Sequence, residues 1–338
     1  MHFFLYEWIT GGGLVEDHGK LPAALLAEGS AMIRALAADF SAIPDSQVTI
    51  LQDARLTDLP AASCEVLDIH SSSDLRHEFD RLAAAADWSL VIAPEFDDIL
   101  RTNVAGVLDA GGRSLNASDH FIATAADKHK TAELLRSAGI AAPPGRVLAA
   151  DEETLPADFP YPGVLKPVNG AGSQHTLLVA SAQDEPPPYP WPRRLEKFFP
   201  GRAASVGVLC GHGARHALPP CWQHQSTDGR FTYRGGSVIR ERSLSDRAAQ
   251  LATRAVAAMP AAAGYVGVDL VLGEAADGSE DVVVEVNPRV TTSYVGVRAT
   301  VTENLALQML NAVRGHEVQI TDKAEVVEFS ASGAVWRR

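Results

Sequence analysis

Two apolar segments near the end of the chain each carry an internal acid. "GYVGVDLVLG", residues 264–273, contains Asp269, and "DVVVEVNPR", residues 281–289, contains Glu285 and Asn287. The short charged turn between them predicts an antiparallel hairpin. Residues i and i+2 share one face of a strand, about 6.6 to 6.8 Å apart. Glu285 and Asn287 should therefore point the same way, and Asp269 can face them.

Three oxygen-bearing side chains on one apolar sheet are costly to bury unless they bind a cation. Ligation by oxygen alone suits Mg²⁺, with Mn²⁺ as a substitute, and Mg²⁺ shares phosphate oxygens with its protein ligands. Asp269, Glu285 and Asn287 are therefore candidate metal ligands, and Arg289 is a candidate clamp for a phosphoryl group or an anionic substrate. The structural alternative is a set of salt bridges at a sheet edge.

Strands and helices alternate over about the first 115 residues. The pattern predicts strands in "HFFLYEW", "QVTILQD" and "WSLVIAPE", and helices near "LPAALLAEGSAMIRALAADF" and "DLRHEFDRLAAAA". Such alternation is typical of a parallel, helix-covered α/β sheet, whose ligands bind at the carboxyl ends of the strands.

A run of three glycines, residues 11–13, follows the first predicted strand. "LVEDHGKL" lacks the first glycine and the Ser or Thr of the Walker pattern, and Glu16 stands where the dinucleotide pattern needs its last glycine. A tight strand-to-helix turn is the favoured interpretation. The backbone amides of Gly12 and Gly13 could still hold a substrate carboxylate.

A second module begins near residue 119. "SDHFIATAADKHKTAELLRSAGI" is predicted as one helix, and "GVLKPVNGAGSQHTLLV" as two strands around a glycine loop. Backbone amides of such a loop can fold over phosphate oxygens, with Lys166 adding a point charge at its base. An ordinary Asn-Gly turn with an exposed lysine is the alternative. The candidate phosphate-binding residues of the loop are Gly170, Gly172 and Ser173.

The segment "RRLEKFFPG" follows a proline-rich connector. Charged residues beside two phenylalanines are expected where a strand end offers backbone hydrogen bonds next to an apolar slot, the combination that a flat heterocycle needs. The candidates are Glu196, Lys197 and Phe198. A buried aromatic pair at a domain joint is the alternative.

Composition excludes several classes of function. The formal net charge of −13 argues against a nucleic-acid partner, since no segment concentrates Lys and Arg. No apolar run is long enough for a bilayer, and the first residues are expected to form a strand and not a basic leader, so we expect a cytoplasmic protein. Three cysteines give no disulfide framework. "CGHGARHALPPCWQH" offers five Cys and His side chains, but without paired ligand spacing on a helix, so zinc is a minor alternative there. The oligomeric state stays open, a homodimer included.

The ordered set of these motifs resembles the ATP-grasp superfamily. The matching residues are Lys128 in "ADKHKTAELLRSAGI", the loop "KPVNGAGS", the hinge "LEKFFPG", Asp269 and "EVNPR". The resemblance implies an ATP-grasp fold with an N-terminal α/β domain, over 1–118, a small lobe over 119–195 and a large lobe over 196–338. It also implies that Lys128 and Lys166 contact ATP phosphates, that the hinge meets adenine, and that Mg²⁺ is held as above. "GRAAS" departs from the family with Ala203, where many members place a glutamate for the ribose.

Four further segments are most similar to the tyramine–glutamate ligase group of methanofuran-type coenzyme biosynthesis. They are "LYEWITGGG", "IAPEFDDIL", "PGRAASVGVL" and "NPRVTTSYVG". The resemblance implies an ADP-forming C–N ligase that phosphorylates the glutamate γ-carboxylate and joins it to an aromatic amine such as tyramine or tyrosine. The alternatives are a ligase of other amino acids and a non-catalytic nucleotide-binding protein. Candidate substrate contacts besides the glycines are Glu95, Arg289, Thr291, Thr292, Ser293 and Tyr294, with packing at a domain boundary as their alternative.

Overall fold

The N-terminal part of the chain is a parallel sheet covered on both faces. In the computed structural model, which describes residues 1–57, 64–150, 152, 154–170 and 173–337, four strands lie in the order β3-β2-β1-β4. Phe3 and Leu5 pack with the helix α1, whereas Phe4 and Tyr6 pack with α2 and α3 on the opposite face. A central strand buried on both faces needs apolar residues at consecutive positions, which "FFLY" supplies. The elements are β1 (His2–Glu7), α1 (Ala23–Ser41), β2 (Gln47–Asp53), β3 (Glu65–Ile69), α2 (Ser72–Ala85), β4 (Trp88–Ile92), η1 (Phe96–Asp98) and α3 (Ile99–Asp109).

The predicted parallel sheet is confirmed, with one strand more than expected. β3, "EVLDI", escaped prediction because it is a short strand at the edge of the sheet, with an acid at two of its five positions. Edge strands tolerate charged residues, since one side meets solvent.

The single helix predicted from residue 118 is wrong, because the structure has two helices there. They are α4 (Asp119–Ala126) and α5 (Lys128–Ser137). Asp127 between them has an extended backbone, and its side chain accepts hydrogen bonds from the amides of His129 and Lys130. An aspartate that caps a helix in this way starts a new helix instead of continuing the old one. The break places Lys128 at the first position of α5.

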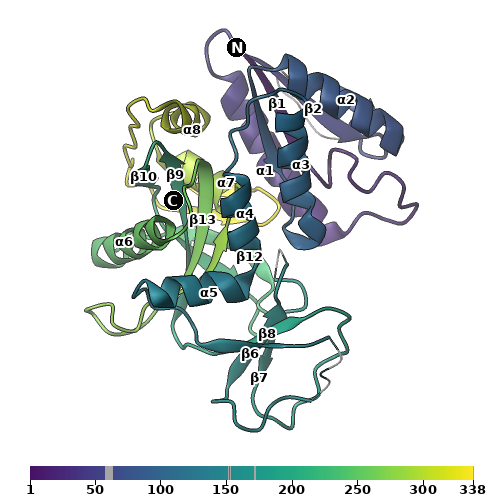
Figure 1. The fold of residues 1–338 in the computed structure, drawn as a ribbon. Coiled ribbons are helices and arrows are strands. Elements are labelled where there is room, and N and C mark those ends of the chain that lie inside the picture. Colours follow the sequence, from purple (N-terminus) through teal and green to yellow (C-terminus); the bar gives the residue numbers. More distant parts are fainter. Residues whose placement is uncertain (58–63, 151, 153, 171–172, 338) are drawn as a thin grey trace.

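The small sheet below this helix pair is entirely antiparallel, in the order β5-β8-β6-β7. Its strands are β5 (Gly145–Leu148), β6 (Gly163–Pro167), β7 (Leu177–Val179) and β8 (Arg193–Lys197). The predicted hairpin is confirmed, since Gly163 pairs with Val179 and Leu165 with Leu177. Figure 1 shows this lobe at the bottom, apart from the purple N-terminal sheet at the top.

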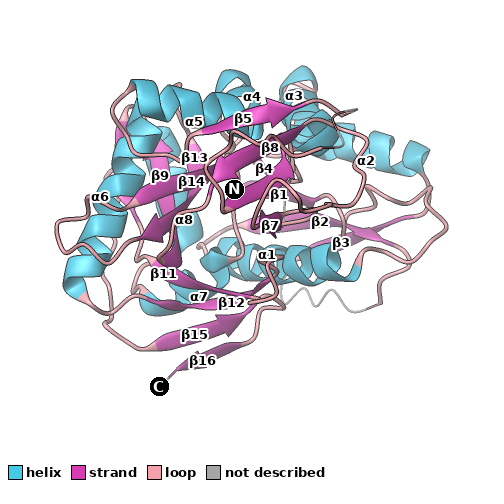
Figure 2. Ribbon diagram, turned by 90° about the horizontal axis from the view of Figure 1, so that it is seen from below, coloured by secondary structure: helices cyan, strands magenta, loops and turns pink. Residues whose placement is uncertain are grey.

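The third and largest sheet has eight strands. Its order is β14-β13-β9-β11-β12-β15-β16, with β10 paired to β9, and Figure 2 shows the long row of strands running toward the C-terminus. Helices α4, α5 and α6 cover one face and α7 and α8 the other. The elements are β9 (Arg202–Gly211), β10 (Ala214–Ala217), β11 (Cys221–Gln225), β12 (Tyr233–Val238), α6 (Arg242–Ala258), β13 (Gly264–Leu272), β14 (Val282–Asn287), α7 (Ser293–Thr300), α8 (Leu305–Arg314), β15 (Val327–Ser330) and β16 (Val335–Arg337).

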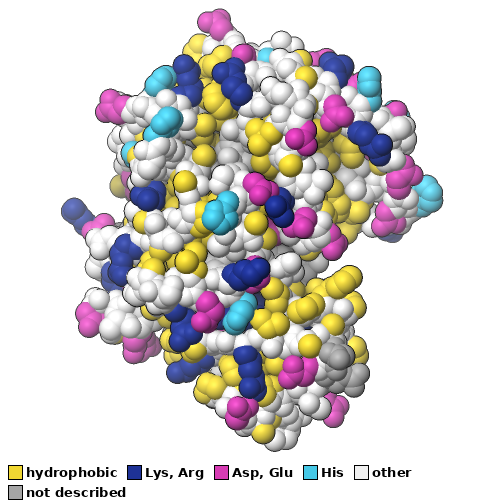
Figure 3. All heavy atoms as spheres, in the orientation of Figure 1, with side chains coloured by type: hydrophobic (Ala, Val, Ile, Leu, Met, Phe, Trp, Pro, Cys, Tyr) yellow, Lys and Arg dark blue, Asp and Glu magenta, His cyan; other side chains and the backbone are white. Residues whose placement is uncertain are grey.

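Two features bear on the surface and the helices. Charged side chains of both signs are interspersed on the face drawn in Figure 3, with no broad basic patch. Among the described helices, none combines the length and the apolar character that crossing a bilayer requires.

Candidate functional site

A cavity of about 200 Å³ lies between α1, the small lobe and the large sheet. Segments far apart in the chain line it: α1 beside the N-terminal sheet, the start of α5, β6 and β8 of the small sheet, and strands β9, β11, β12, β13 and β14 of the large sheet with the residues that follow β14. The structure brings most of the predicted site residues together here. They are Lys128, Lys166, Gly170, Ser173, Glu196, Lys197, Phe198, Asp269, Glu285, Asn287, Arg289, Thr292 and Ser293, with Thr291 beside them.

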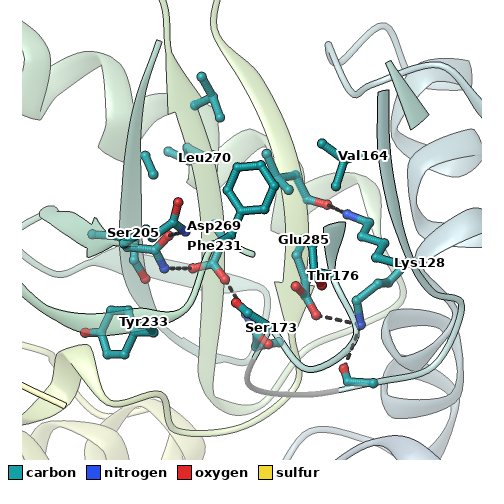
Figure 4. Close-up of a pocket in the computed structure, with 18 of the residues that line it drawn as sticks. Lys128, Val164, Ser173, Thr176, Ser205, Phe231, Tyr233, Asp269, Leu270 and Glu285 are labelled. Carbon is teal, nitrogen blue, oxygen red and sulfur yellow. Dashed lines mark hydrogen bonds and ion pairs between the residues drawn. The ribbon is translucent and has the colours of Figure 1, made fainter. Parts of the chain in front are cut away.

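The hairpin places Asp269 directly opposite Glu285, as predicted. Asp269 accepts hydrogen bonds from the side-chain amides of Gln223 (2.9 Å) and Asn287 (3.1 Å). Burial, and then the neighbouring charge of Glu285, raise the pKa of Asp269 to about 6. Figure 4 shows both carboxylates projecting from adjacent strands into the same space. Two facing acids, of which one is hard to ionise, form a donor set that a cation would stabilise.

Both lysines that were expected to meet phosphates are paired with carboxylates. The Lys128 ammonium lies 2.8 Å from Glu285 and donates to the Gly170 carbonyl at 2.6 Å. Lys166 lies 2.6 Å from Glu196. Although burial alone would raise the pKa of Glu285, Lys128 and Lys166 hold it below its ordinary value. The two acids thus keep two cations in place at the wall of the cavity.

The hinge strand β8 differs in detail from its prediction. Glu196 is buried between Lys166 and Arg194, whose guanidinium also contacts His129 and the Pro143 carbonyl. The amides that follow are also engaged, because Lys197 N–H donates to Pro144 at 2.9 Å and Phe198 N–H to Pro162 at 3.0 Å. These two amides are therefore already used and do not donate to a ring nitrogen of a heterocycle, whereas a carbonyl oxygen of this backbone could accept from a heterocyclic N–H.

The Arg289 guanidinium forms an ion pair with Glu95. The guanidinium donates from Nε and Nη2 to the two carboxylate oxygens of Glu95, at 2.9 and 3.3 Å. Glu95 is itself nearly fully buried, just after β4. A planar fork of this kind fixes the orientation of the arginine and balances its charge.

The two glycines that were predicted to contact a substrate carboxylate, Gly12 and Gly13, do not line the cavity. The Gly13 amide donates to the Trp8 carbonyl at 2.8 Å, and a Cβ on Gly13 would lie 2.2 Å from the indole of Trp8. Gly12 has a φ of +94°, and neither residue is among those that line the cavity. These contacts support the interpretation as a tight turn. Gly172 lies outside the described residues.

Tyr294 is also directed away from the cavity. It is fully buried, and its hydroxyl donates to Asp39 of α1 at 2.7 Å. Arg298 contacts the same carboxylate. Tyr294 therefore joins α7 to α1, and it is not among the described residues that line the cavity.

Sequence reasoning missed several residues that line the cavity. Glu28 reaches it from α1, and Gln223 and Tyr233 reach it from β11 and β12. Thr292 donates to Glu28 at 2.9 Å. Glu28 is one acid in an alanine-rich helix, so no local pattern distinguishes it from a solvent-exposed residue.

The cysteines and histidines of residues 210–224 do not converge. Cys210 and Cys221 are buried, and each thiol donates to a carbonyl two residues before it. His212 contacts the Val313 carbonyl and His224 contacts Ser237. Over the part of the chain that the structure describes, no group of three or more His, Cys, Asp or Glu side chains is arranged to hold a metal ion. Asp269 and Glu285 are two acids, with an amide as the third donor.

Family comparison agrees with this geometry. Residues 125–293, half of the chain, match the ATP-grasp domain. The chain belongs to the ATP-grasp family. A pre-ATP-grasp domain matches residues 46–122, within the N-terminal part. In this ATP-grasp protein, every described residue that lines the cavity, except Glu28, lies within the ATP-grasp match.

Relatives of this ATP-grasp protein include a tyramine–L-glutamate ligase from Methanocaldococcus fervens, which is 25% identical over 97% of this chain and 98% of the relative. Among solved structures, an ATP-grasp superfamily protein from Archaeoglobus fulgidus has a TM-score of 0.70 at 22% identity, covering 97% of this chain and 92% of the other. An N5-carboxyaminoimidazole ribonucleotide synthetase, solved as an ADP complex, also has a TM-score of 0.70, at 16% identity, covering 97% and 80%. The two structural likenesses concern the fold.

Proposed function

We propose that this protein is an ATP- and Mg²⁺-dependent ligase that joins the γ-carboxylate of glutamate to an aromatic amine such as tyramine or tyrosine, with ADP and phosphate as the other products. The observation that carries the proposal is the facing pair Asp269 and Glu285, with Lys128 against it, in a cavity between the lobes of an ATP-grasp chain. The likeness to a tyramine–L-glutamate ligase over nearly the whole chain supports this choice of substrates.

The donor set fits a divalent cation. Asp269, Glu285 and Asn287 would hold Mg²⁺, because two opposed carboxylates and an amide oxygen are hard ligands, and a cation would offset the burial and the charge of Glu285 that raise the pKa of Asp269. When bound, Mg²⁺ supplies charge neutralisation for the phosphates of ATP.

The lysines and Arg289 would bring two anions together. A carboxylate and a nucleoside triphosphate repel each other, so the site must place cations beside both. Lys128 and Lys166 face the cavity from the small lobe, and each can exchange its carboxylate partner for a phosphate oxygen. Glu95 orients Arg289, and the guanidinium of Arg289 would attract an anionic substrate.

The proposal predicts a defined isotope transfer. Glutamate labelled with ¹⁸O in its γ-carboxylate is incubated with ATP, Mg²⁺ and tyramine, and the phosphate and the organic product are analysed by mass spectrometry. An acyl phosphate intermediate moves one ¹⁸O into inorganic phosphate and gives an amide one water lighter than its two components. Omission of each component in turn is the control. AMP release, unlabelled phosphate, or turnover only with other amino-acid pairs would contradict the proposal.

A further inference from the structure

The carboxylates that line the cavity divide into two kinds. The described lining residues include four acids: Glu28, Glu196, Asp269 and Glu285. Glu285 is paired with Lys128 and Glu196 with Lys166, at 2.8 and 2.6 Å. The other two have no Lys or Arg in ion-pair contact among the described residues. A carboxylate withdrawn from water without a cation is unfavourable, so it either takes up a proton or is stabilised by a positively charged ligand.

A cation would therefore stabilise both Asp269 and Glu28, but the surroundings of the two carboxylates differ. Asp269 accepts two amide hydrogen bonds and faces a second acid, which suits the metal proposed above. Glu28 accepts a hydrogen bond from the Thr292 hydroxyl through one of its two oxygens, and no second donor to it is found among the described residues. A single carboxylate with a free oxygen is the usual partner of an ammonium group, which forms a charge-assisted hydrogen bond with it.

The charges around Glu28 favour the same ligand. The nearest guanidinium, that of Arg289, already holds Glu95 through two hydrogen bonds. Glu7, at the end of β1, accepts from the amides of Ile9 and Thr10 and adds a further carboxyl. Tyr233 approaches from β12 with a neutral phenol. Among the described residues, Glu28 thus has no Lys or Arg in ion-pair contact, and Arg289 compensates its charge only from a distance.

Glu28 also stands at the junction of two cavities. A smaller one, of about 40 Å³, shares Glu28 and Arg289 with the main cavity and is otherwise mostly apolar. Its apolar residues are Ile9, Leu25, Met32, Ile92, Ala93 and Pro94. Burial raises the pKa of Glu28, against the opposing effects of Thr292 and Arg289. A carboxylate in such a setting is a better proton acceptor than one in water.

We propose that Glu28 binds the ammonium group of the amine substrate and accepts the proton that must leave before the nitrogen can attack. This inference rests on the proposed ligase function and adds a residue of the N-terminal domain to its catalytic site. Glu28 then binds the amine, on the opposite wall from the hairpin residues that would hold the metal.

The step balances without any further reactant. An alkyl ammonium ion, with a pKa of about 10 like that of lysine, has no lone pair at neutral pH. Its transfer of one proton to Glu28 gives a neutral amine and a protonated carboxyl group. The nitrogen lone pair then forms the C–N bond at the acyl carbon, and the C–O bond to phosphate breaks, its electron pair leaving with the phosphate. The second N–H proton passes to the departing phosphate as the amide forms.

The test compares a charged and an uncharged amine in the full chain. Tyramine is an ammonium ion at neutral pH, whereas hydroxylamine is uncharged there and traps an acyl phosphate directly as a hydroxamate. For Glu28→Gln we expect the tyramine-dependent kcat/KM to fall about 100-fold or more, with hydroxamate formation from glutamate and ATP within about threefold of the wild type. Thr292→Val, which removes the hydroxyl donor, should lower the tyramine reaction about threefold to tenfold. Glu133→Gln on the exposed side of α5 is the matched control and should change neither reaction.

An equilibrium measurement separates this inference from the proposed function. Tyramine and 4-ethylphenol, which lacks the amine, are titrated into wild type and Glu28→Gln by calorimetry. Wild type should bind tyramine at least about tenfold more tightly than 4-ethylphenol, and the variant should lose that preference. If wild type shows the preference but makes no amide, the proposed function fails and the ammonium site stands. Equal binding of both compounds by wild type, unchanged tyramine kinetics in the variant, or equal loss of hydroxamate formation would each overturn the assignment.

Discussion

The two walls of the cavity differ in how their charges are arranged. On the hairpin side, Glu285 and Lys128 form a close ion pair next to Asp269, and the two acids lie on paired strands. On the α1 side, Glu28 comes from a helix and Thr292 and Arg289 from the segment after β14. The first wall is built largely by local pairing of strands, and the second by contact between distant segments.

The two walls should therefore respond differently to amino-acid substitution. A hairpin keeps its register through backbone hydrogen bonds, so a side-chain change there should alter charge and chemistry without moving the strands. The α1 wall depends on helix packing, with Tyr294 and Arg298 of α7 both bound to Asp39 of α1. Changes in that contact should weaken the joint between domains before they alter chemistry.

The largest effect is expected for Glu285→Gln on the hairpin wall. The variant loses a charge from the proposed metal site, so turnover should fall about 100-fold or more, with partial recovery at high Mg²⁺. Lys128 also loses its partner, so the metal-free protein should lose about 1 to 3 kcal/mol of unfolding free energy. Mg²⁺ titration of kcat and urea unfolding in EDTA measure the two effects. Full activity at low Mg²⁺ would remove the metal site from this wall.

Asp269→Asn gives a pH-dependent effect of intermediate size. The folded pKa of Asp269, about 6, lies above its ordinary value of 3.8. The folded state then binds more protons than the unfolded state between these values, so the unfolding free energy of the metal-free protein falls as pH rises from about 4 to about 6. Asp269→Asn removes this decrease and should be more stable than wild type above pH 6, by up to about 2 to 3 kcal/mol.

Urea unfolding from pH 4 to 8 in EDTA measures that difference. Added Mg²⁺ should stabilise wild type more than Asp269→Asn, because only the wild type has both carboxylates. Parallel stability curves for the two proteins across this pH range would show that Asp269 ionises normally, and would leave Glu28 of the α1 wall as the acid with the raised pKa.

The smallest effect is expected for Tyr294→Phe at the joint behind the α1 wall. Loss of the hydrogen bond to Asp39 should lower the unfolding free energy by about 1 to 2 kcal/mol and leave the KM for the amine within about twofold. A double-mutant cycle with Asp39→Asn isolates the coupling between the two side chains. A large change in amine KM without loss of stability would mean that Tyr294 acts on substrate, as its sequence position first suggested.

Local periodicity predicted the hairpin wall well. Side chains alternate strictly along a strand, so the spacing of Glu285 and Asn287, with Asp269 on the partner strand, was enough to place all three on one face. The glycine hairpin β6–β7 and the parallel N-terminal sheet followed from the same kind of pattern. The capping side chain of Asp127, which divides one predicted helix into two, was visible in the sequence but was not used.

Only the tertiary structure decided which charges compensate each other. Glu95 and Arg289 are 194 residues apart, and Thr292 is 264 residues from Glu28, yet each pair is in hydrogen-bond contact. No periodicity encodes such contacts, because they depend on how α1, the end of β4 and the segment after β14 pack together. The sequence by itself thus determined which acids line the hairpin, since strand geometry is local. The packing of the domains determined that Lys128 and Lys166 are paired while Glu28 has no ion-pair partner among the described residues, since burial and charge compensation depend on the complete fold.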